Sequence, residues 1–370
     1  MNTTLKILSV YFCFFVVLCS CKSHSIKESV ILTYYPFKIG NYWGCMDTTC
    51  NFKLQPKFEF ISEFSEKKAL VLSNGKYAYI DDSCVFKTNF NYTDATLFSE
   101  SKAFVVDSSG ALICLSDKFS KLFTLKNVQE VDFFSEGLAA IKKNNKFGFI
   151  DTTGSVIIEP KYDQVLSFSD GLCAVASSKI KGDSLLFSWS FIDKAGKVVL
   201  KGPFLEANGF EKGLASVKFM NGNSCWIDKL GKNVFNVSYK ECRSFSEEVA
   251  IFRDTLFYGI INRNGTVLLK PTYISIGNFS DGLASIEFNE HQVGYIDTHG
   301  KIVIKPVFQF VSKYSQGIAY VCKDEKLILI NKAGLPTCDF QFDSAPGFLG
   351  KGVGFIDLAL NKKILLSSVR

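Results

Sequence analysis

The sequence is poor in histidine, which narrows the chemistry it can support. Only three of its 370 residues are histidine, namely His24, His291 and His299. Catalysis by a histidine base requires an imidazole held beside a nucleophile. His299 lies in a short polar turn, DTHG, and related turns elsewhere in the chain carry Thr153 or Ala195 at its position. We therefore interpret His299 as a tolerated turn residue and expect no histidine-based enzyme.

Motifs for phosphate, metal and redox chemistry are also missing. The chain contains neither a glycine-rich phosphate loop nor a CxxC pair. Acidic residues recur in short turns, where they have a structural duty, whereas calcium needs several oxygens that converge on one point. We predict no metal and no cofactor. Two glycosidase carboxylates would be recognised by their separation in space, so a carboxylate-dependent hydrolase on a propeller-like fold stays open as an alternative.

Charge and proline are both sparse. Charged residues make up 21% of the chain, and 42 Lys and Arg against 36 Asp and Glu give a formal net charge of +6. The positive charges form no block of the kind that follows a phosphate backbone, so we expect no nucleic-acid partner. Aromatic residues reach 14%, with 36 Phe against 8 Pro. This composition is typical of a packed, β-rich protein.

The first residues have the layout of a secretory signal. MNTTLKILSVYFCFFVVLCSCKSHS contains Lys6, an apolar run over residues 7–18 and then small residues. The apolar run is too short to span a bilayer stably. Its end, LCSC, resembles the lipobox of bacterial lipoproteins. That resemblance implies removal of residues 1–20 and a diacylated Cys21 as the first mature residue, with residues 21–29 as a lipid-anchored tether. An ordinary cleaved signal is the alternative, and both predict export.

The cysteines do not form an obvious disulfide framework. Of the 12 cysteines, two would leave with the signal and Cys21 would carry lipid, and the odd number that remains cannot all pair. Several others, such as Cys173, lie in apolar strand patterns and are interpreted as small core side chains. Cys45 and Cys50 flank the turn in GCMDTTCN, which makes them candidates for a disulfide across a hairpin.

A phrase of aromatic, serine and acid, here called the corner phrase, recurs along the chain. Its spacing is 34 to 36 residues, apart from one interval of 42, which identifies a tandem array. The long interval contains a polar insertion, SSKIKGDSLLFS, in a hairpin loop between Ala176 and Trp189. The corner phrases begin at Phe64, Phe98, Phe134, Phe168, Phe210, Phe245, Phe279 and Tyr314, with a worn copy at Phe348.

Each copy, here called a unit, predicts a small antiparallel meander. An alternating strand such as GLAAIKK leads through a polar turn to an aromatic and small pair and a YID or FID strand. An Asp-x-x-Gly turn follows, because Asp bonds the backbone and Gly accepts positive φ. A β-branched strand such as SVIIEP then ends in a proline that blocks further pairing. One unit is too small to bury its apolar face, so neighbouring units must stack.

Two passages carry a family resemblance. KFGFIDTTGSVIIEPKYD at residues 146–163 and VGYIDTHGKIVIKPVF at residues 293–308 resemble the WG-containing (KWG) repeat family. The resemblance extends over residues 38–357, and Trp43-Gly44 keeps the literal pair. It implies an all-β repeat protein, common in bacteria, with no activity attached to its signature residues.

We predict an all-β fold in which residues 30–370 form about nine units, the last one truncated. Two arrangements suit such meanders. An open superhelical array accepts any number of units and would use its worn ends as caps. A closed β-propeller is the alternative, although this number of units is at its upper limit. We favour the open array.

The predicted function is a non-enzymatic scaffold in the bacterial cell envelope. Trp43, Trp189 and Trp226 would either stack on sugars or, more commonly for an aromatic at a fixed repeat position, form core between units. The expected partner is another envelope protein or a polysaccharide, with membrane contact only through the lipid anchor and with residues 179–188 as a candidate contact surface. A hydrolase and a purely structural envelope protein are the alternatives.

Overall fold

The computed structural model describes residues 34–39, 42–47, 51–181, 184–289, 292–324, 326–337, 342–343, 355–359 and 363–367. Every regular element in these ranges is a β-strand. The strands are β1 (Tyr35–Ile39), β2 (Tyr42–Met46), β3 (Phe52–Phe58), β4 (Phe60–Ile61), β5 (Lys68–Ser73), β6 (Lys76–Asp81), β7 (Asp94–Ala95), β8 (Lys102–Val106), β9 (Leu112–Ser116), β10 (Lys121–Leu125), β11 (Glu130–Ser135), β12 (Leu138–Lys143), β13 (Lys146–Asp151), β14 (Val156–Tyr162), β15 (Gln164–Val165), β16 (Leu172–Lys181), β17 (Ser184–Asp193), β18 (Val198–Ala207), β19 (Ala215–Phe219), β20 (Ser224–Ile227), β21 (Glu241–Cys242), β22 (Val249–Arg253), β23 (Tyr258–Asn262), β24 (Val267–Tyr273), β25 (Ser275–Ile276), β26 (Leu283–Asn289), β27 (Gln292–Asp297), β28 (Ile302–Phe308), β29 (Phe310–Val311), β30 (Ile318–Lys323), β31 (Lys326–Asn331), β32 (Phe342–Asp343), β33 (Phe355–Ala359) and β34 (Lys363–Ser367).

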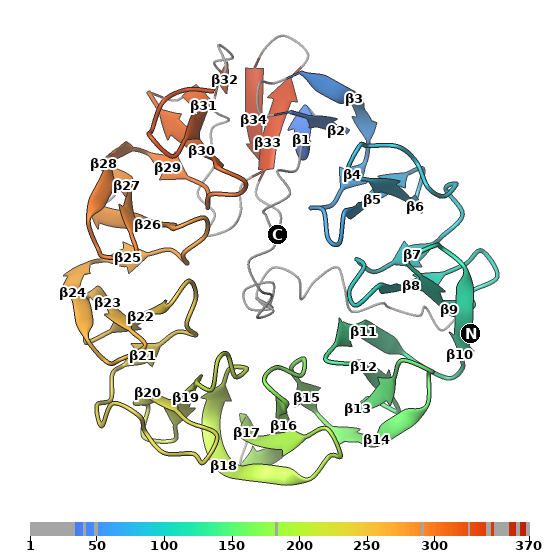
Figure 1. The fold of residues 1–370 in the computed structure, drawn as a ribbon, viewed down its shortest axis with the longest axis horizontal. Coiled ribbons are helices and arrows are strands. Elements are labelled where there is room, and N and C mark those ends of the chain that lie inside the picture. Colours follow the sequence, from blue (N-terminus) through green and yellow to red (C-terminus); the bar gives the residue numbers. More distant parts are fainter. Residues whose placement is uncertain are drawn as a thin grey trace.

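The strands of the described residues form eight small sheets arranged as the blades of a closed β-propeller (Figure 1). The all-β prediction is confirmed, but the favoured open superhelical array is wrong and the propeller alternative is correct. One sheet has the order β3-β2-β1-β33-β34, so strands from the two ends of the chain share it. Its β1 and β33 pair in parallel through Lys38 and Asp357. Strands from both ends of the chain thus complete one blade, which closes the ring.

The predicted insertion lengthens two strands. β16 and β17 each have 10 residues and pair in register as far as Lys181 opposite Ser184. β18 also has 10 residues and continues into the next unit, where Ala207 pairs with Val217 of β19. The result is a six-stranded sheet, β15 to β20, that spans two units. This is the place in the ring where the regular repeat is broken.

The glycine of the aromatic and glycine pair is required by the outer strand of its blade. A Cβ on Gly148 would lie 2.3 Å from the carbonyl oxygen of Ile158 and 2.6 Å from the nitrogen of Pro160. β14 runs two residues past Pro160, with register shifts against β13 at this point. The expectation that the proline ends the strand is therefore wrong. A bulge leaves its position without a ladder hydrogen bond, so the missing N–H has no cost there.

Departures from this glycine confirm its role. Ser190 replaces it in the fifth unit, and there Gly202 on the opposite strand provides the space. A Cβ added to Gly202 would lie 1.9 Å from the Trp189 oxygen. Ala78 and Cys225 replace it in two other units, whose outer segments make only isolated β-bridges among the described residues. Close contacts like that of Gly148 recur, with a Cβ to carbonyl oxygen distance of 2.5 Å, at Gly44, Gly259 and Gly294.

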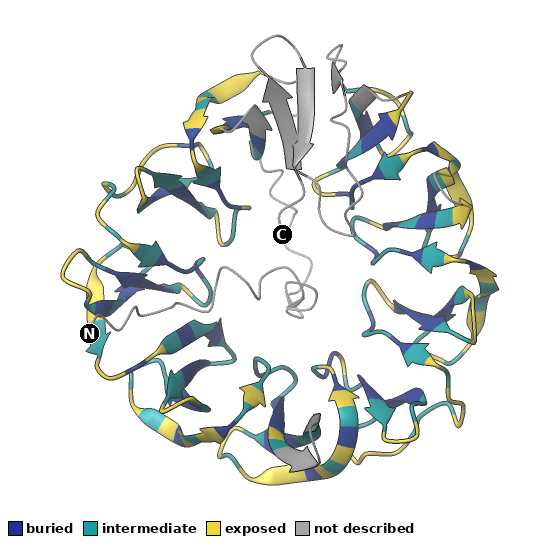
Figure 2. Ribbon diagram, turned by 180° about the vertical axis from the view of Figure 1, so that it is seen from behind, coloured by how far each residue is buried: buried dark blue, intermediate teal, exposed yellow. Residues whose placement is uncertain are grey.

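The core lies between neighbouring sheets, as the stacking prediction required. One buried cluster combines Phe149 of β13 with Phe168, which belongs to the next unit. The two rings pack edge to face, with centroids 4.9 Å apart. Figure 2 shows buried residues on the inner strands and exposed residues along the outer rim. Each unit therefore completes the apolar face of its neighbour.

Polar side chains of the corner phrase also tie successive units together. The Ser135 hydroxyl donates a hydrogen bond to the Phe168 oxygen at 2.7 Å. The Glu100 carboxylate accepts hydrogen bonds from the main-chain N–H groups of Glu136 and Gly137 at 2.7 and 2.8 Å. Equivalent serine bonds start from Ser65, Ser99, Ser169 and Ser246. Equivalent carboxylate bonds start from Glu66, Glu136, Asp170, Glu247 and Asp281.

Candidate functional site

The structure describes only some of the cysteines and histidines singled out in the sequence. Cys21, His24, Cys50 and His291 lie outside the described residues. His299 is an exposed turn residue whose main-chain N–H donates to Asp297 Oδ1 at 2.9 Å. It is the single histidine in the part of the chain that the structure describes. The interpretation of His299 as a turn residue is confirmed.

The described cysteines are core residues. All seven of them are buried, which confirms the interpretation of Cys173 as a small core side chain. Cys45 is one of the seven, so the predicted Cys45–Cys50 disulfide stays a prediction because Cys50 lies outside the described ranges. No group of three or more His, Cys, Asp or Glu side chains in those ranges could hold a metal ion. None of the described segments forms a helix long and apolar enough to cross a membrane.

The tryptophans divide between core and surface. Trp43 and Trp226 are 5% and 1% exposed, so they are core between units and the sugar-stacking alternative is wrong for them. The Trp226 indole N–H donates to the Arg243 oxygen at 2.8 Å, which satisfies its polar edge. Trp189 is half-buried and forms part of the wall of a surface hollow. It is therefore the tryptophan of the three that a partner can contact.

The carboxylates of the turn acids accept hydrogen bonds from the backbone of their own turns. Asp151 Oδ1 accepts main-chain hydrogen bonds from Thr153 at 2.9 Å and Ser155 at 3.0 Å. The hydrogen bond from the Thr153 hydroxyl and these N–H groups hold the pKa of Asp151 below its ordinary value. The structural role predicted for these acids is confirmed. The same pattern occurs at Asp193, Asp228, Asn262, Asp297 and Asn331.

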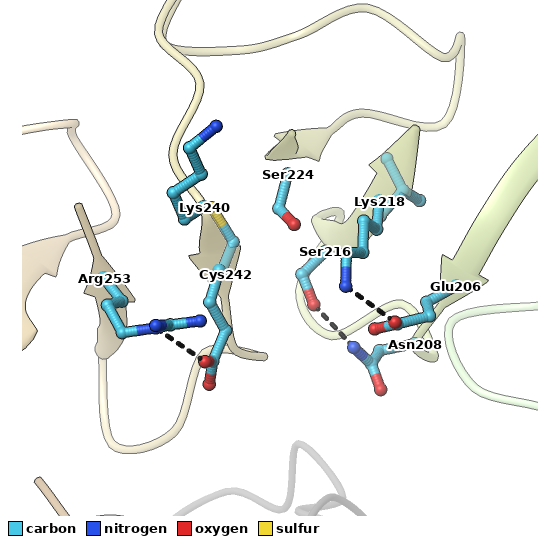
Figure 3. Close-up of a pocket in the computed structure, with 10 residues that line it drawn as sticks. Glu206, Asn208, Ser216, Lys218, Ser224, Lys240, Cys242 and Arg253 are labelled. Carbon is cyan, nitrogen blue, oxygen red and sulfur yellow. Dashed lines mark hydrogen bonds and ion pairs between the residues drawn. The ribbon is translucent and has the colours of Figure 1, made fainter. Parts of the chain in front are cut away.

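Two adjoining hollows lie where the repeat is broken, and we call them together the seam groove. The first has a volume of about 130 Å³ and is walled by β18, β19, β20, β21 and β22 (Figure 3). The second, of about 240 Å³, extends toward β15 and Trp189. They share Glu206 and Asn208. The long β18 carries Glu206 into this position because it continues from one unit into the next.

The β18 and β19 side of the seam groove is held by polar contacts. Figure 3 shows the Lys218 ammonium turned toward the Glu206 carboxylate, and their N and O atoms are 2.9 Å apart. Beside them the Asn208 amide donates to the Ser216 hydroxyl at 2.9 Å. Glu206 keeps 64% of its side-chain surface exposed. It can therefore meet a partner without leaving Lys218.

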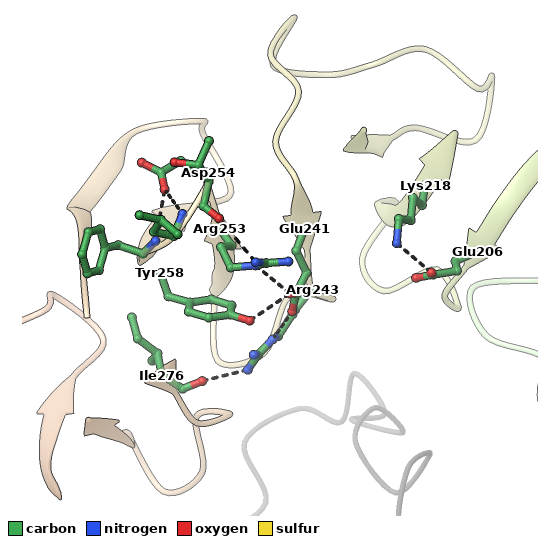
Figure 4. Close-up of polar contacts among 11 residues, drawn as sticks. Glu206, Lys218, Glu241, Arg243, Arg253, Asp254, Tyr258 and Ile276 are labelled. Atoms are coloured by element: carbon green, nitrogen blue, oxygen red, sulfur yellow. Dashed lines mark hydrogen bonds and ion pairs between the residues drawn. The ribbon is translucent and has the colours of Figure 1, made fainter. Parts of the chain in front are cut away.

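The opposite side centres on Glu241 (Figure 4). Its carboxylate accepts hydrogen bonds from Arg243 Nε at 3.0 Å, Arg253 Nε at 3.2 Å and the Tyr258 hydroxyl at 2.9 Å. Arg243 also donates to the Ile276 oxygen at 2.8 Å, which fixes it to the next sheet. The Arg253 guanidinium lies over the Tyr258 ring, 5.6 Å from its centroid. These contacts hold the groups in one geometry.

The electrostatics of Glu241 decide what the seam groove can do. Partial burial acts to raise the pKa of Glu241, but the hydrogen bonds from Arg243 and Tyr258 and the charge of Arg253 outweigh it and lower the pKa. A general acid needs the opposite, a carboxyl kept protonated near neutral pH. The groove instead offers fixed charges of both signs beside one aromatic face. Such a surface suits recognition of a polar partner.

The fold defines the protein as a repeat β-propeller, and the seam groove lies on its surface. The WG containing repeat model matches residues 43–77, 127–147, 147–176, 189–223, 226–254, 258–290 and 294–326. The chain therefore belongs to the WG containing repeat family. The family resemblance drawn from the sequence is confirmed.

Two solved structures are similar to this chain at low sequence identity. A eukaryotic initiation factor is similar with a TM-score of 0.56 and 12% identity, covering 82% of this chain and 94% of its own. BamB from Moraxella catarrhalis has a TM-score of 0.42 and 13% identity, covering 74% and 91% of the two chains. The first likeness shows the fold alone. A comparison with curated proteins gives no match.

Proposed function

We propose that this protein is a non-enzymatic scaffold of the bacterial cell envelope, exported by its N-terminal segment and held at the membrane by lipid on Cys21. Its partner binds at the seam groove. The observation that carries the proposal is the seam groove itself, because charged residues from neighbouring sheets are fixed there. A repeat β-propeller provides a rigid frame of the kind used for protein interaction.

A protein partner fits the seam groove better than a polysaccharide. Sugars bind well to rows of exposed aromatic faces, whereas Trp43 and Trp226 are buried and the groove offers Trp189 alone of the three. Lys240 and Glu206 instead present charges of opposite sign at the surface. Mixed charges around a partly apolar centre favour a protein interface. The polysaccharide alternative is an outcome of the test below.

Support for a role other than hydrolysis comes from the acids of the seam groove. Glu206 pairs with Lys218, and Glu241 pairs with two arginines. A hydrolase pair would need one carboxyl free to donate a proton. We therefore propose binding without catalysis at this site.

The binding test uses charge reversal at the seam groove. We would purify the tagged full chain from its native membrane and identify its companions, comparing wild type with the pair Lys240→Glu and Glu206→Lys. The matched control reverses Lys161 and Glu159, which are exposed on β14. We expect the groove pair to lose a specific companion by about tenfold or more, and the control pair to keep it.

The companion is then purified, and its affinity for the three proteins is measured. Equal binding by the groove pair, the control pair and wild type would contradict the proposal. Loss of the companion after glycan-degrading treatment would show that the seam groove binds a polysaccharide instead. The absence of any specific companion would favour the purely structural alternative.

The anchor is tested separately. Wild type is expected in the membrane fraction and Cys21→Ala in the soluble fraction of the envelope, because a diacyl anchor accounts for the attachment. Mass measurement of the mature N-terminus checks that residues 1–20 are removed. If Cys21→Ala stays with the membrane, the lipoprotein assignment is wrong.

A further inference from the structure

Cys84 occupies a backbone position that six other units give to glycine and the third unit gives to Phe119. It ends the turn DDSC, and its φ is 59°, in the left-handed region. A side chain with a Cβ is disfavoured there, so a cysteine at this point needs a reason. The corresponding residues of the regular turns all have φ between 78° and 88° and are Gly154, Gly196, Gly231, Gly265, Gly300 and Gly334.

Cys45 is unusual in the same part of the ring. It lies in β2 and pairs with Leu54 of β3, as Phe149 of β13 pairs with Ile158 of β14. Most other units carry a large aromatic side chain at this position, namely Tyr79, Phe149, Phe191, Trp226 and Tyr295. The first unit therefore has a small thiol where a ring would otherwise fill the space.

The two unusual cysteines, Cys45 and Cys84, lie in the same part of the core. In regular units the turn glycine faces the outer strand of the preceding unit, since a Cβ added to Gly196 would lie 3.2 Å from the Ile158 side chain. In line with this geometry Cys84, in the turn after β6, packs in one cluster with Cys45 of β2 and Phe58 of β3. Cys45 and Cys84 belong to one buried cluster, with exposed fractions of 0% and 4%. The larger turn residue thus occupies space left by the missing ring.

We propose that Cys45 and Cys84 form a disulfide bond that fastens the ring-closing sheet to the next sheet. The bond would join β2 to the turn after β6, across the boundary between two units. It would use Cys45, and so would exclude the Cys45–Cys50 bridge expected from the sequence. In the cell this inference rests on the proposed export, because disulfides persist in oxidising compartments.

Formation of the Cys45–Cys84 bond requires an oxidant, and a second disulfide can supply it. Each thiol loses one proton and one electron as the Sγ–Sγ bond forms, and a protein disulfide or oxidised glutathione takes up both and becomes two thiols. The hydrogen bond with Cys84, and then burial, raise the pKa of Cys45 in the folded protein. Thiolate is therefore scarce once the core has closed. The bond must form during folding, while both thiols are still accessible.

Cys114 is an internal control for the oxidation of Cys45. Cys114 has the same position in the third unit as Cys45 has in the first, and it is equally buried. The turn that follows in the next unit ends in Gly154, which offers no sulfur and whose added Cβ would lie 2.8 Å from the Phe123 ring. Cys114 should therefore stay a thiol under conditions that oxidise Cys45.

The test refolds the full chain in a glutathione redox buffer, alkylates free thiols in denaturant and maps the cysteines by mass spectrometry. We expect a peptide pair linked through Cys45 and Cys84, with Cys114 alkylated. Oxidised wild type should lose roughly 5 °C of its unfolding midpoint on reduction. Cys84→Gly, which restores the glycine of the repeat, should show no such loss, and Cys114→Ala should keep it.

Alkylation of both Cys45 and Cys84 after refolding would overturn the inference, and so would a link between Cys45 and Cys50. The same mapping is applied to protein extracted from native membranes. If the bond forms on refolding but is absent from the native material, the proposed export fails while the pairing stands. The two proposals are thus tested apart.

Discussion

The carboxylate of Glu100 accepts a hydrogen bond from the main-chain N–H of Glu136, 36 residues further along the chain, at 2.7 Å. Its second oxygen accepts from the next residue at 2.8 Å, so one side chain caps the corner of the following unit. Glu136 repeats the contact toward Gly171 at 2.9 Å. The recurrence of acids in the corner phrase follows from this linkage, because each acid fixes the position of the next sheet.

The first prediction removes one of these links. Glu100→Ala leaves two partly buried N–H groups without their acceptor, and we expect the free energy of unfolding to fall by about 1–3 kcal/mol. Glu159→Ala, at an exposed position on the outer strand, should change it by less than about 0.5 kcal/mol. Chemical denaturation of both variants checks the difference. Equal effects would show that the corner acids do not link units.

The second prediction concerns the space beside the outer strand. Gly148→Ala places a Cβ 2.3 Å from the Ile158 oxygen, a backbone atom that moves only with the strand. We expect a loss of about 1–3 kcal/mol, or more if the bulge cannot shift. Gly209→Ala is the control, because its Cβ would touch only Ser169, at 3.8 Å. A Gly148→Ala protein as stable as this control would refute the explanation of the repeat glycine.

The third prediction is a pH dependence. Burial raises the pKa of Asp132 from 3.8 to about 6, against the opposing hydrogen bond from the Phe133 N–H. The folded protein therefore binds this proton more tightly than the unfolded chain does. From this group alone, stability is greatest below pH 4, falls as the pH rises toward 6 and is constant above. Asp132→Asn should add about 1–3 kcal/mol at pH 7 and nothing near pH 4.

Asp163 provides a control of opposite sign. The hydrogen bond from Lys146 is the main cause that lowers the pKa of Asp163. Its ionised form therefore stabilises the fold above the ordinary pKa, and that contribution is lost as the pH falls through the lowered value. Asp163→Asn should reduce stability at pH 7 and have no effect in strong acid. Denaturation curves from strong acid to pH 8 would contradict both assignments if the two variants behaved alike.

The fourth prediction compares two cations at equivalent turn positions. Arg263 donates to the Glu211 oxygen at 2.9 Å, approaches its carboxylate at 3.4 Å and lies over the Phe245 ring. Its side chain is 15% exposed. Lys229 makes the corresponding bond to the Asp170 oxygen from an exposed position. Arg263→Ala should cost about 2–4 kcal/mol and Lys229→Ala less than about 1 kcal/mol, as measured by thermal unfolding.

Much of the fold could be predicted because the repeated residues determine their turns and strands through local interactions. Asp151 and Gly154 specify a tight turn wherever they occur, and their sister residues do so in register. Ring closure could not be predicted in this way. It depends on a small rotation between sheets, set by contacts such as Ser135 to Phe168 that join residues 33 positions apart.

The seam groove was not predicted either. The insertion at residues 179–188 was visible in the sequence, but its effect was assigned to a loop. In the structure the insertion extends β16 and β17, whereas Glu206 faces Lys218 at the register position where Glu130 faces Lys142 in a sister unit. The segment from Gly196 of the DKAG turn to the next corner phrase at Phe210 is as long as the segment from Gly154 to Phe168 in a sister unit, so its length gave no signal.

Small-angle X-ray scattering of the mature chain in solution tests the central claim most directly. A closed propeller of about 350 residues is compact, and we expect a radius of gyration of about 20 Å with a symmetric pair-distance distribution. An open superhelical array of the same units would give a markedly larger radius and a distribution with a long tail. Observation of the extended form would contradict the closed ring and, with it, the placement of the seam groove.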